Sequence, residues 1–127
     1  MEGNPALVAA AGAAALIAIL IVVVRRRLTP EELERRRRLA VNARGRITDA
    51  VITDVAAVQT PSGGVSHLVH YRYDLHGVRY SAAQDITSLL AQIPRDPSRI
   101  AGPASVKYLR ANPSNSIVVC EKWSGLR

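Results

Sequence analysis

The residues that could hold a metal ion are few and far apart. His67 and His70 are three positions apart in a segment that alternates apolar and polar residues, and His76 stands just before Gly77. Residues three apart on a β-strand point to opposite faces of the sheet, so His67 and His70 cannot share one ion. No cysteine or carboxylate cluster accompanies them in the sequence. We therefore expect no metal site.

Signatures of catalysis are also missing from the sequence. The aspartates Asp49, Asp54, Asp74 and Asp85 are scattered over separate segments, and no glycine-rich phosphate loop, serine nucleophile elbow or His-Glu-x-x-His motif occurs. The single cysteine, Cys120, lies in an apolar run, which is typical of a small buried thiol. The sequence thus predicts a protein that is not an enzyme and needs no cofactor.

The aromatic residues leave two interpretations open. We expect the four tyrosines to pack in the core and across strands, although a ligand could also stack on them: Tyr71, Tyr73, Tyr80 and Tyr108. Trp123, after the last apolar run, is either a lid on one end of the domain or an exposed contact for a partner.

The segments that carry these residues have the pattern of β-structure. Apolar and polar residues alternate over 65–75, with a turn before this segment at Pro61–Gly64 and another after it at His76-Gly77. We expect one short helical turn over 87–93 and strands over 46–59, 65–75, 78–86, 104–109 and 116–121. Five short strands predict a small, mostly antiparallel β-barrel or curved-sheet domain over residues 45–127.

A family resemblance rests on turn and strand residues of this domain: Gly45, Tyr71-Arg72-Tyr73, Gly77 with Tyr80, Gly102, Val106-Lys107-Tyr108 and Asn112-Pro113-Ser114-Asn115-Ser116. Over residues 45–119 this array resembles the bacterial membrane-anchored family catalogued as domain of unknown function 3592. The resemblance implies a membrane span followed by a small β domain, and it brings no catalytic residues.

The chain departs from the family pattern in two places. Arg110-Ala111 stand where the family often has Asp-Pro. The second span that often follows the domain does not occur in residues 120–127, so the topology of the family is not carried over.

The first third of the chain predicts a transmembrane helix over residues 6–24. These nineteen residues carry no charged or polar side chain, and as a helix they would extend about 28 Å, close to the thickness of a bilayer's hydrocarbon core. A secretory signal peptide would begin with basic residues, whereas residues 1–5 contain only an acid. A buried soluble helix this apolar would need a larger protein around it.

The flanking charges predict how this helix is oriented. Residues 1–5 contain no Lys or Arg, whereas Arg25, Arg26 and Arg27 follow the apolar stretch directly. Basic residues remain on the cytoplasmic side of a membrane. We expect a single-pass protein of the bacterial cytoplasmic (inner) membrane, with a short external N-terminus over 1–5 and the C-terminal domain in the cytoplasm.

Small residues recur along the predicted span. They form a file in which alanines are four positions apart, with a glycine nearby: Ala6, Ala10, Ala14, Ala18 and Gly12. Residues four apart share a helix face, and small side chains let another helix approach closely. The file is either simple apolar filler or a helix-docking face for another subunit or a second copy.

Residues 25–44 predict a basic juxtamembrane helix. Thr29 can cap it, Pro30 suits the first helical position, Glu32 completes a capping box, and Gly45 can end it. Its acids and bases also form i,i+4 pairs in the favourable order: Glu31 with Arg35, Glu32 with Arg36 and Glu34 with Arg38. The arginines therefore belong to a structured and partly self-neutralised helix.

Residues 25–46 hold nine Arg and three Glu, whereas the rest of the β domain is nearly neutral. Nucleic-acid binding would call for aromatic residues among these arginines, and none precedes Tyr71. We expect no nucleic-acid partner. Instead we expect contact with anionic lipid headgroups, while a solvated spacer and a partner-docking helix remain alternatives; the membrane-surface residues are Arg25, Arg26, Arg27, Arg35, Arg36, Arg37 and Arg38.

Together these features predict a non-catalytic, single-span accessory or structural subunit of a bacterial membrane protein complex. It would dock on other membrane subunits, in a hetero- or homo-oligomer, through its Ala-rich span and its cytoplasmic β domain. The alternative is a membrane-anchored binding module whose β-barrel recognises a peptide, a lipid or a small ligand.

Overall fold

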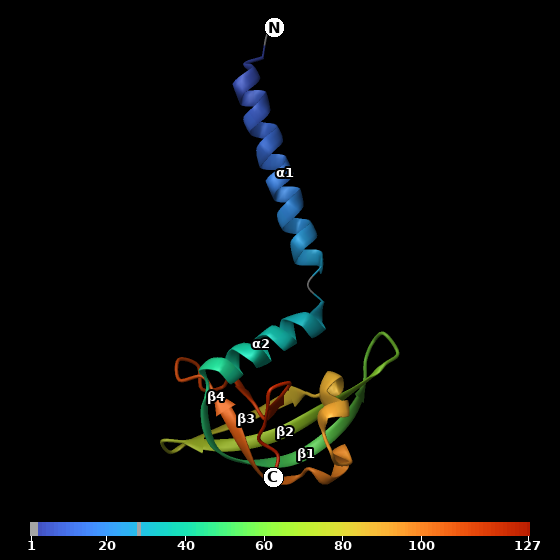
Figure 1. Ribbon diagram of the computed structural model, residues 1–127, viewed down its shortest axis with the longest axis vertical. Helices are drawn as coiled ribbons and strands as arrows, with labels where there is room; N and C mark the ends of the chain where they lie inside the picture. Colours follow the sequence, from blue (N-terminus) through green and yellow to red (C-terminus); the bar gives the residue numbers. More distant parts are fainter. Residues whose placement is uncertain (1–2, 28) are drawn as a thin grey trace. The chain divides into compact units, whose positions relative to one another are not determined.

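A computed structural model describes the backbone of residues 3–27 and 29–127 and the side chains of residues 3–24 and 29–127 (Figure 1). The chain forms two compact units, one ending at Glu34 and one running from Arg35 to Arg127. The first unit contains helix α1 (Pro5–Arg27) and the start of α2 (Pro30–Arg44), and the second contains the rest of α2 and all strands.

Helix α1 is the apolar helix that the sequence predicts. Asn4 caps it, because its side-chain oxygen accepts a hydrogen bond from the backbone nitrogen of Ala6 at 3.1 Å. By length and composition, Pro5–Val24 is able to cross a membrane, and none of this stretch is buried against other residues. Such a helix leaves no backbone group unpaired in hydrocarbon.

The predicted caps of α2 are confirmed. Thr29 Oγ1 accepts a hydrogen bond from the backbone nitrogen of Glu32 at 3.2 Å, and Pro30 is the first helical residue. At the other end, the Gly45 nitrogen donates to Val41 O at 2.6 Å. A Cβ at Gly45 would lie 2.4 Å from the same oxygen, so this close turn into the next strand requires glycine.

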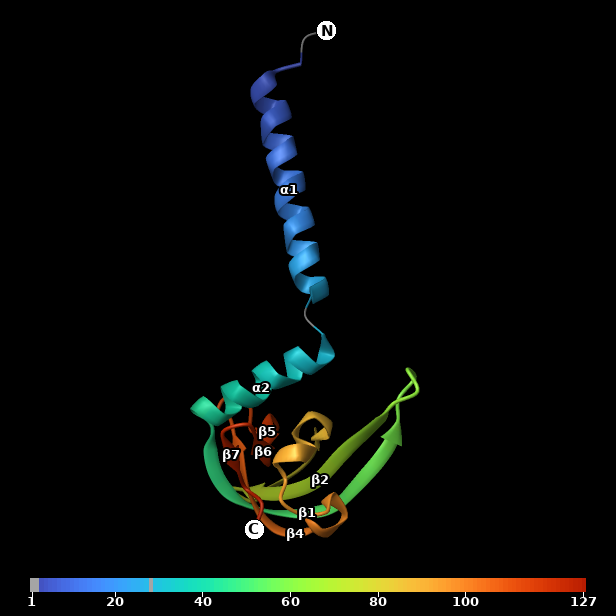
Figure 2. The same cartoon turned by 45° about the vertical axis from the view of Figure 1, so that its right-hand side comes forward.

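Five strands form the predicted antiparallel, barrel-like sheet. The sheet is nearly closed (Figure 2). Its order is β3-β2-β1-β4-β5. The strands are β1 (Arg46–Gln59), β2 (Val65–Leu75), β3 (Val78–Asp85), β4 (Gly102–Tyr108) and β5 (Ser116–Ile117). All four neighbouring pairs run antiparallel.

Alternating side chains along the strands build the core. Val69, Tyr71 and Tyr73 of β2 are buried, as the period of two predicts. The pairing of β1 with β2 shifts between Ile52 and Asp54, which leaves one extra residue on β1. Such a bulge bends a strand and increases its twist, so β1 can curve around the core.

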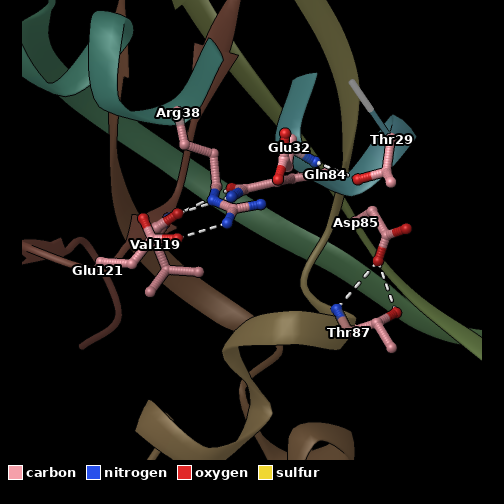
Figure 3. Close-up of polar contacts among 8 residues, drawn as sticks. All are labelled: Thr29, Glu32, Arg38, Gln84, Asp85, Thr87, Val119 and Glu121. Atoms are coloured by element: carbon pink, nitrogen blue, oxygen red, sulfur yellow. Dashed lines mark hydrogen bonds and ion pairs between the residues drawn. The ribbon is translucent and has the colours of Figure 1, made fainter. Parts of the chain in front are cut away.

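Two short 3₁₀ helices lie between β3 and β4. The first, η1 (Thr87–Gln92), confirms the predicted helical turn and brings buried Leu89 to the core. Asp85 Oδ1 accepts from the nitrogen and the hydroxyl of Thr87 at 2.9 and 2.6 Å (Figure 3). The second, η2 (Pro97–Arg99), is capped by Asp96 and was not predicted within this proline-rich connection.

The prediction of one strand over 116–121 is wrong. Strand β5 ends at Ile117, and β6 (Val119–Cys120) instead pairs with β7 (Trp123–Ser124) as a small hairpin. The buried side chain of Gln84 takes the place of a neighbouring strand here. Its amide donates to Val119 O at 2.6 Å and accepts from the nitrogens of Val118 and Val119 at 2.7 and 3.3 Å. Gln84 thereby links edge strand β3 to the junction between β5 and β6.

Candidate functional site

The arginines predicted at the membrane surface are divided by the structure. Arg38 is almost fully buried, with 3% of its side chain exposed, and its Nη2 lies 2.5 Å from Glu121 Oε1 (Figure 3). Arg37 donates to Asn115 Oδ1 at 2.8 Å and to Ser116 O at 2.9 Å. Arg35 and Arg36 are exposed. The side chains of Arg25, Arg26 and Arg27 lie outside the described residues.

Apolar packing completes the attachment of α2 to the sheet. Val41 is fully buried against Ile117 and Cys120, with Leu109 and Trp123 packed beside them. These contacts, with those of Arg37, Arg38 and Asn42, form what we call the α2 interface. Because it ties helix residues 35–44 to the C-terminal strands, this half of α2 is part of the β domain.

Trp123 lies within this interface. Its ring is half-buried, and Lys107 Nζ lies 4.9 Å from the ring centroid. The same ammonium group donates to Asn42 O and Oδ1 at 3.2 and 2.8 Å. Trp123 therefore packs under α2 and retains only part of its surface for a partner.

The electrostatics of the α2 interface centre on Glu121. Burial, the largest single influence, raises the pKa of this carboxyl group. The hydrogen bond from Arg38, a backbone hydrogen bond and the charges of Arg38 and Arg35 together outweigh burial. The pKa of Glu121 is therefore lowered from its ordinary value. Glu121 remains ionised near neutral pH and paired with Arg38.

The small-residue file on α1 is exposed in the structure. The side chains of Ala6, Ala10, Ala14 and Ala18 are all exposed, and a Cβ built at Gly12 would meet no atom within 4 Å. Its role in helix docking stays a prediction.

The histidines and carboxylates do not gather into a ligand set. Within residues 3–27 and 29–127, no group of three His, Cys, Asp or Glu side chains is placed to hold a metal ion. His67 is half-buried, and His76 lies exposed in the β2–β3 turn. The buried thiol of Cys120 belongs to the α2 interface.

The tyrosines form one stacked cluster. The ring of Tyr73 lies 6.0 Å from that of Tyr71, 5.5 Å from that of Tyr80 and 6.5 Å from that of Tyr108, centroid to centroid. Burial raises the pKa of the Tyr73 phenol, so its hydroxyl keeps its proton and donates to Pro113 O at 2.5 Å. Tyr71 and Tyr73 are core residues, as predicted, whereas Tyr80 and Tyr108 remain partly exposed.

The partly exposed rings of Tyr80 and Tyr108 border a cavity of about 350 Å³, which we call the barrel-end pocket. It lies where β1 begins, where β4 ends and where β2 turns into β3. The turn is tight because His76 and Gly77 both have positive φ angles, 50° and 81°. The lining residues are Arg46, Leu75, His76, Val78, Tyr80, Tyr108, Arg110 and Pro113.

Sequence reasoning missed this pocket as a site. It raised ligand stacking on the tyrosines but did not single out Arg46 or Arg110, which are 64 positions apart. Arg46 is opposite Tyr108 in the pairing of β1 with β4, and Arg110 follows two residues later. The available signal was Arg46 at the start of one predicted strand and Arg110 just after the end of another, which carries Tyr108.

Comparisons with known proteins add no relative. No protein-family model, no curated protein and no solved structure matches this chain. The resemblance to domain of unknown function 3592 over residues 45–119 therefore stays a prediction. The functional proposal rests on the residues and contacts described above.

Proposed function

We propose that this chain is a non-catalytic, single-span membrane protein that acts as an accessory subunit of a membrane protein complex. In this proposal α1 crosses the bacterial inner membrane with its N-terminus outside. The β domain lies on the cytoplasmic side. One observation supports it above all: Pro5–Val24 is long and apolar enough to span a membrane, and none of this stretch is buried.

The attachment of α2 to the sheet supports the same role. Residues 35–44 belong to the β domain, so only about ten residues separate the end of the apolar stretch at Val24 from the domain. A chain of that length extends at most about 36 Å. The domain would therefore remain near the membrane surface, where it can contact the cytoplasmic parts of other subunits.

The proposed docking face is the file of small residues on α1. The variants Ala10→Leu and Ala14→Leu add bulk to this face, while Val8→Leu and Val23→Leu enlarge the opposite face and serve as matched controls. After extraction in a mild detergent, we expect the native chain to migrate with at least one further chain. The alanine variants should lose this association and the valine variants should keep it.

The proposal fails if the extracted native chain is a monodisperse monomer, or if both pairs of variants associate like the native chain. A monomer would favour the second candidate function, a membrane-anchored binding module. The barrel-end pocket is the specific observation that favours this candidate.

A further inference from the structure

We propose that the barrel-end pocket binds a small organic anion, in which a planar ring carries a phosphate or carboxylate group. This inference deepens the second candidate function, that of a binding module. It does not depend on the docking of α1, because every lining residue belongs to the unit that begins at Arg35. The two ideas are therefore tested separately.

The charge of the pocket selects an anion. Arg46 and Arg110 line it from the same end of the antiparallel β1–β4 pair, and His76 adds a third nitrogen donor group. Among the described residues neither guanidinium has a hydrogen-bond or ion-pair partner, and no described carboxylate lines the pocket. A guanidinium can present two parallel N–H groups to a carboxylate or phosphate, which makes arginine well suited to both.

The walls of the pocket select a ring. Tyr80 and Tyr108 both stack on the buried ring of Tyr73, with angles of 15° and 23° between the ring planes. This packing fixes the orientation of both rings. Leu75, Val78 and Pro113 supply the remaining apolar surface. A planar ligand can continue such a stack and bury its ring against these side chains.

Size and rigidity favour a small molecule. A cavity of about 350 Å³ lies at the lower end of the range for small-molecule sites, roughly 300–1,000 Å³. The Tyr73 hydroxyl holds the Pro113 loop, and the two-residue turn at His76-Gly77 fixes the rim on the other side. The ligand would meet a largely preformed site.

The ring and the anion are both needed in this arrangement. An uncharged apolar ligand would displace water from the two guanidinium groups without replacing the lost hydrogen bonds, which is unfavourable. A bare inorganic anion would leave the tyrosine and leucine walls unused. A ligand with both parts uses the whole lining.

The test uses the full chain in nanodiscs of phosphatidylcholine, with binding followed by isothermal titration calorimetry. The charged probes are adenosine 5′-monophosphate and 1-naphthoate, and their uncharged counterparts are adenosine and 1-naphthamide. We expect at least one charged probe to bind about tenfold more tightly than its counterpart. Arg46→Gln and Arg110→Gln should each weaken that binding about tenfold, while Arg99→Gln in η2, outside the pocket lining, should not.

The two substitutions should not change the stability of the domain, because the side chains of Arg46 and Arg110 are exposed and have no partner among the described residues. We therefore expect an unchanged melting temperature for both variants. The proposal is overturned if neither charged probe binds more tightly than its uncharged counterpart, or if both arginine variants bind the probes like the native chain.

A third arm uses nanodiscs that contain phosphatidylglycerol. Loss of probe binding there would show that a lipid headgroup occupies the site and would overturn the small-molecule proposal; unchanged binding supports it.

Discussion

The ion-pair partner of Arg38 differs from the one that its sequence neighbours predict. Its local partner in the sequence pattern is Glu34, four positions away, but its guanidinium pairs with Glu121, 83 positions away. The same run of four arginines therefore has two buried or half-buried members and two exposed ones. A basic cluster in sequence is not always a basic surface.

The Arg38–Glu121 pair predicts a pH-dependent contribution to stability. Because the folded pKa of Glu121 is below its unfolded value, the pair stabilises the fold above about pH 4.5, and this contribution is lost as the pH falls through the lowered pKa. At pH 7, Glu121→Gln should lower the free energy of unfolding by about 1–3 kcal/mol. Thermal unfolding of the full chain in detergent across pH 3–7 measures this.

As the pH falls below about 4.5 and through the lowered pKa of Glu121, the difference in stability between Glu121→Gln and the native chain should shrink. Asp54→Asn is the matched control, since the Asp54 side chain is exposed. A difference that stays constant from pH 7 to pH 3 would contradict the account of this ion pair.

Some residue-level features were predictable because their chemistry is local. The Thr29 cap and the His76-Gly77 turn depend only on neighbours within a few positions, and both are confirmed. The role of Gln84 was not predictable. Its three hydrogen bonds join segments 34 and 35 positions away, so they exist only once the sheet has formed.

At the scale of elements, α2 combines two surfaces. Arg37, Arg38 and Val41 face the sheet, while Arg35 and Arg36 remain exposed. We propose that the exposed pair contacts anionic lipid headgroups, which would supply about 1 kcal/mol per arginine near the surface.

This proposal predicts a response to lipid composition. In nanodiscs that contain phosphatidylglycerol, amides of α2 should exchange hydrogen more slowly than in phosphatidylcholine nanodiscs, because headgroup contacts protect the helix. The double variant Arg35→Gln/Arg36→Gln should reduce this difference, and Arg79→Gln/Arg99→Gln, two exposed arginines outside α2, should not. Equal exchange of native α2 in both lipids would count against lipid contact.

The strands were predictable where one face is buried and the other is not. Strand β2 matches its predicted bounds, 65–75, because its alternation reflects a buried and an open face. The segment 116–120 has no such alternation, since all five residues are buried. Its division into β5 and β6 depends on the Gln84 side chain from another strand, which no local pattern records.

At the scale of the whole molecule, composition already separates the chain into an apolar helix and a nearly neutral domain. The fold class was predictable for that reason, because a long uncharged stretch and a set of short strands have different patterns. The barrel-end pocket was not predictable, since its lining comes from three segments that lie far apart in the sequence.

The most direct measurement of the central claim is the labelling of single cysteines by a membrane-impermeant thiol reagent in intact bacterial cells. Cys120 is buried and should not react, so the chain carrying only this residue is the control. The account predicts that Asn4→Cys is labelled in intact cells and that Ser114→Cys, on the exposed β4–β5 loop, is labelled only after the inner membrane is permeabilised. Labelling of Ser114→Cys in intact cells, or release of the chain from membranes by alkaline carbonate, would contradict it.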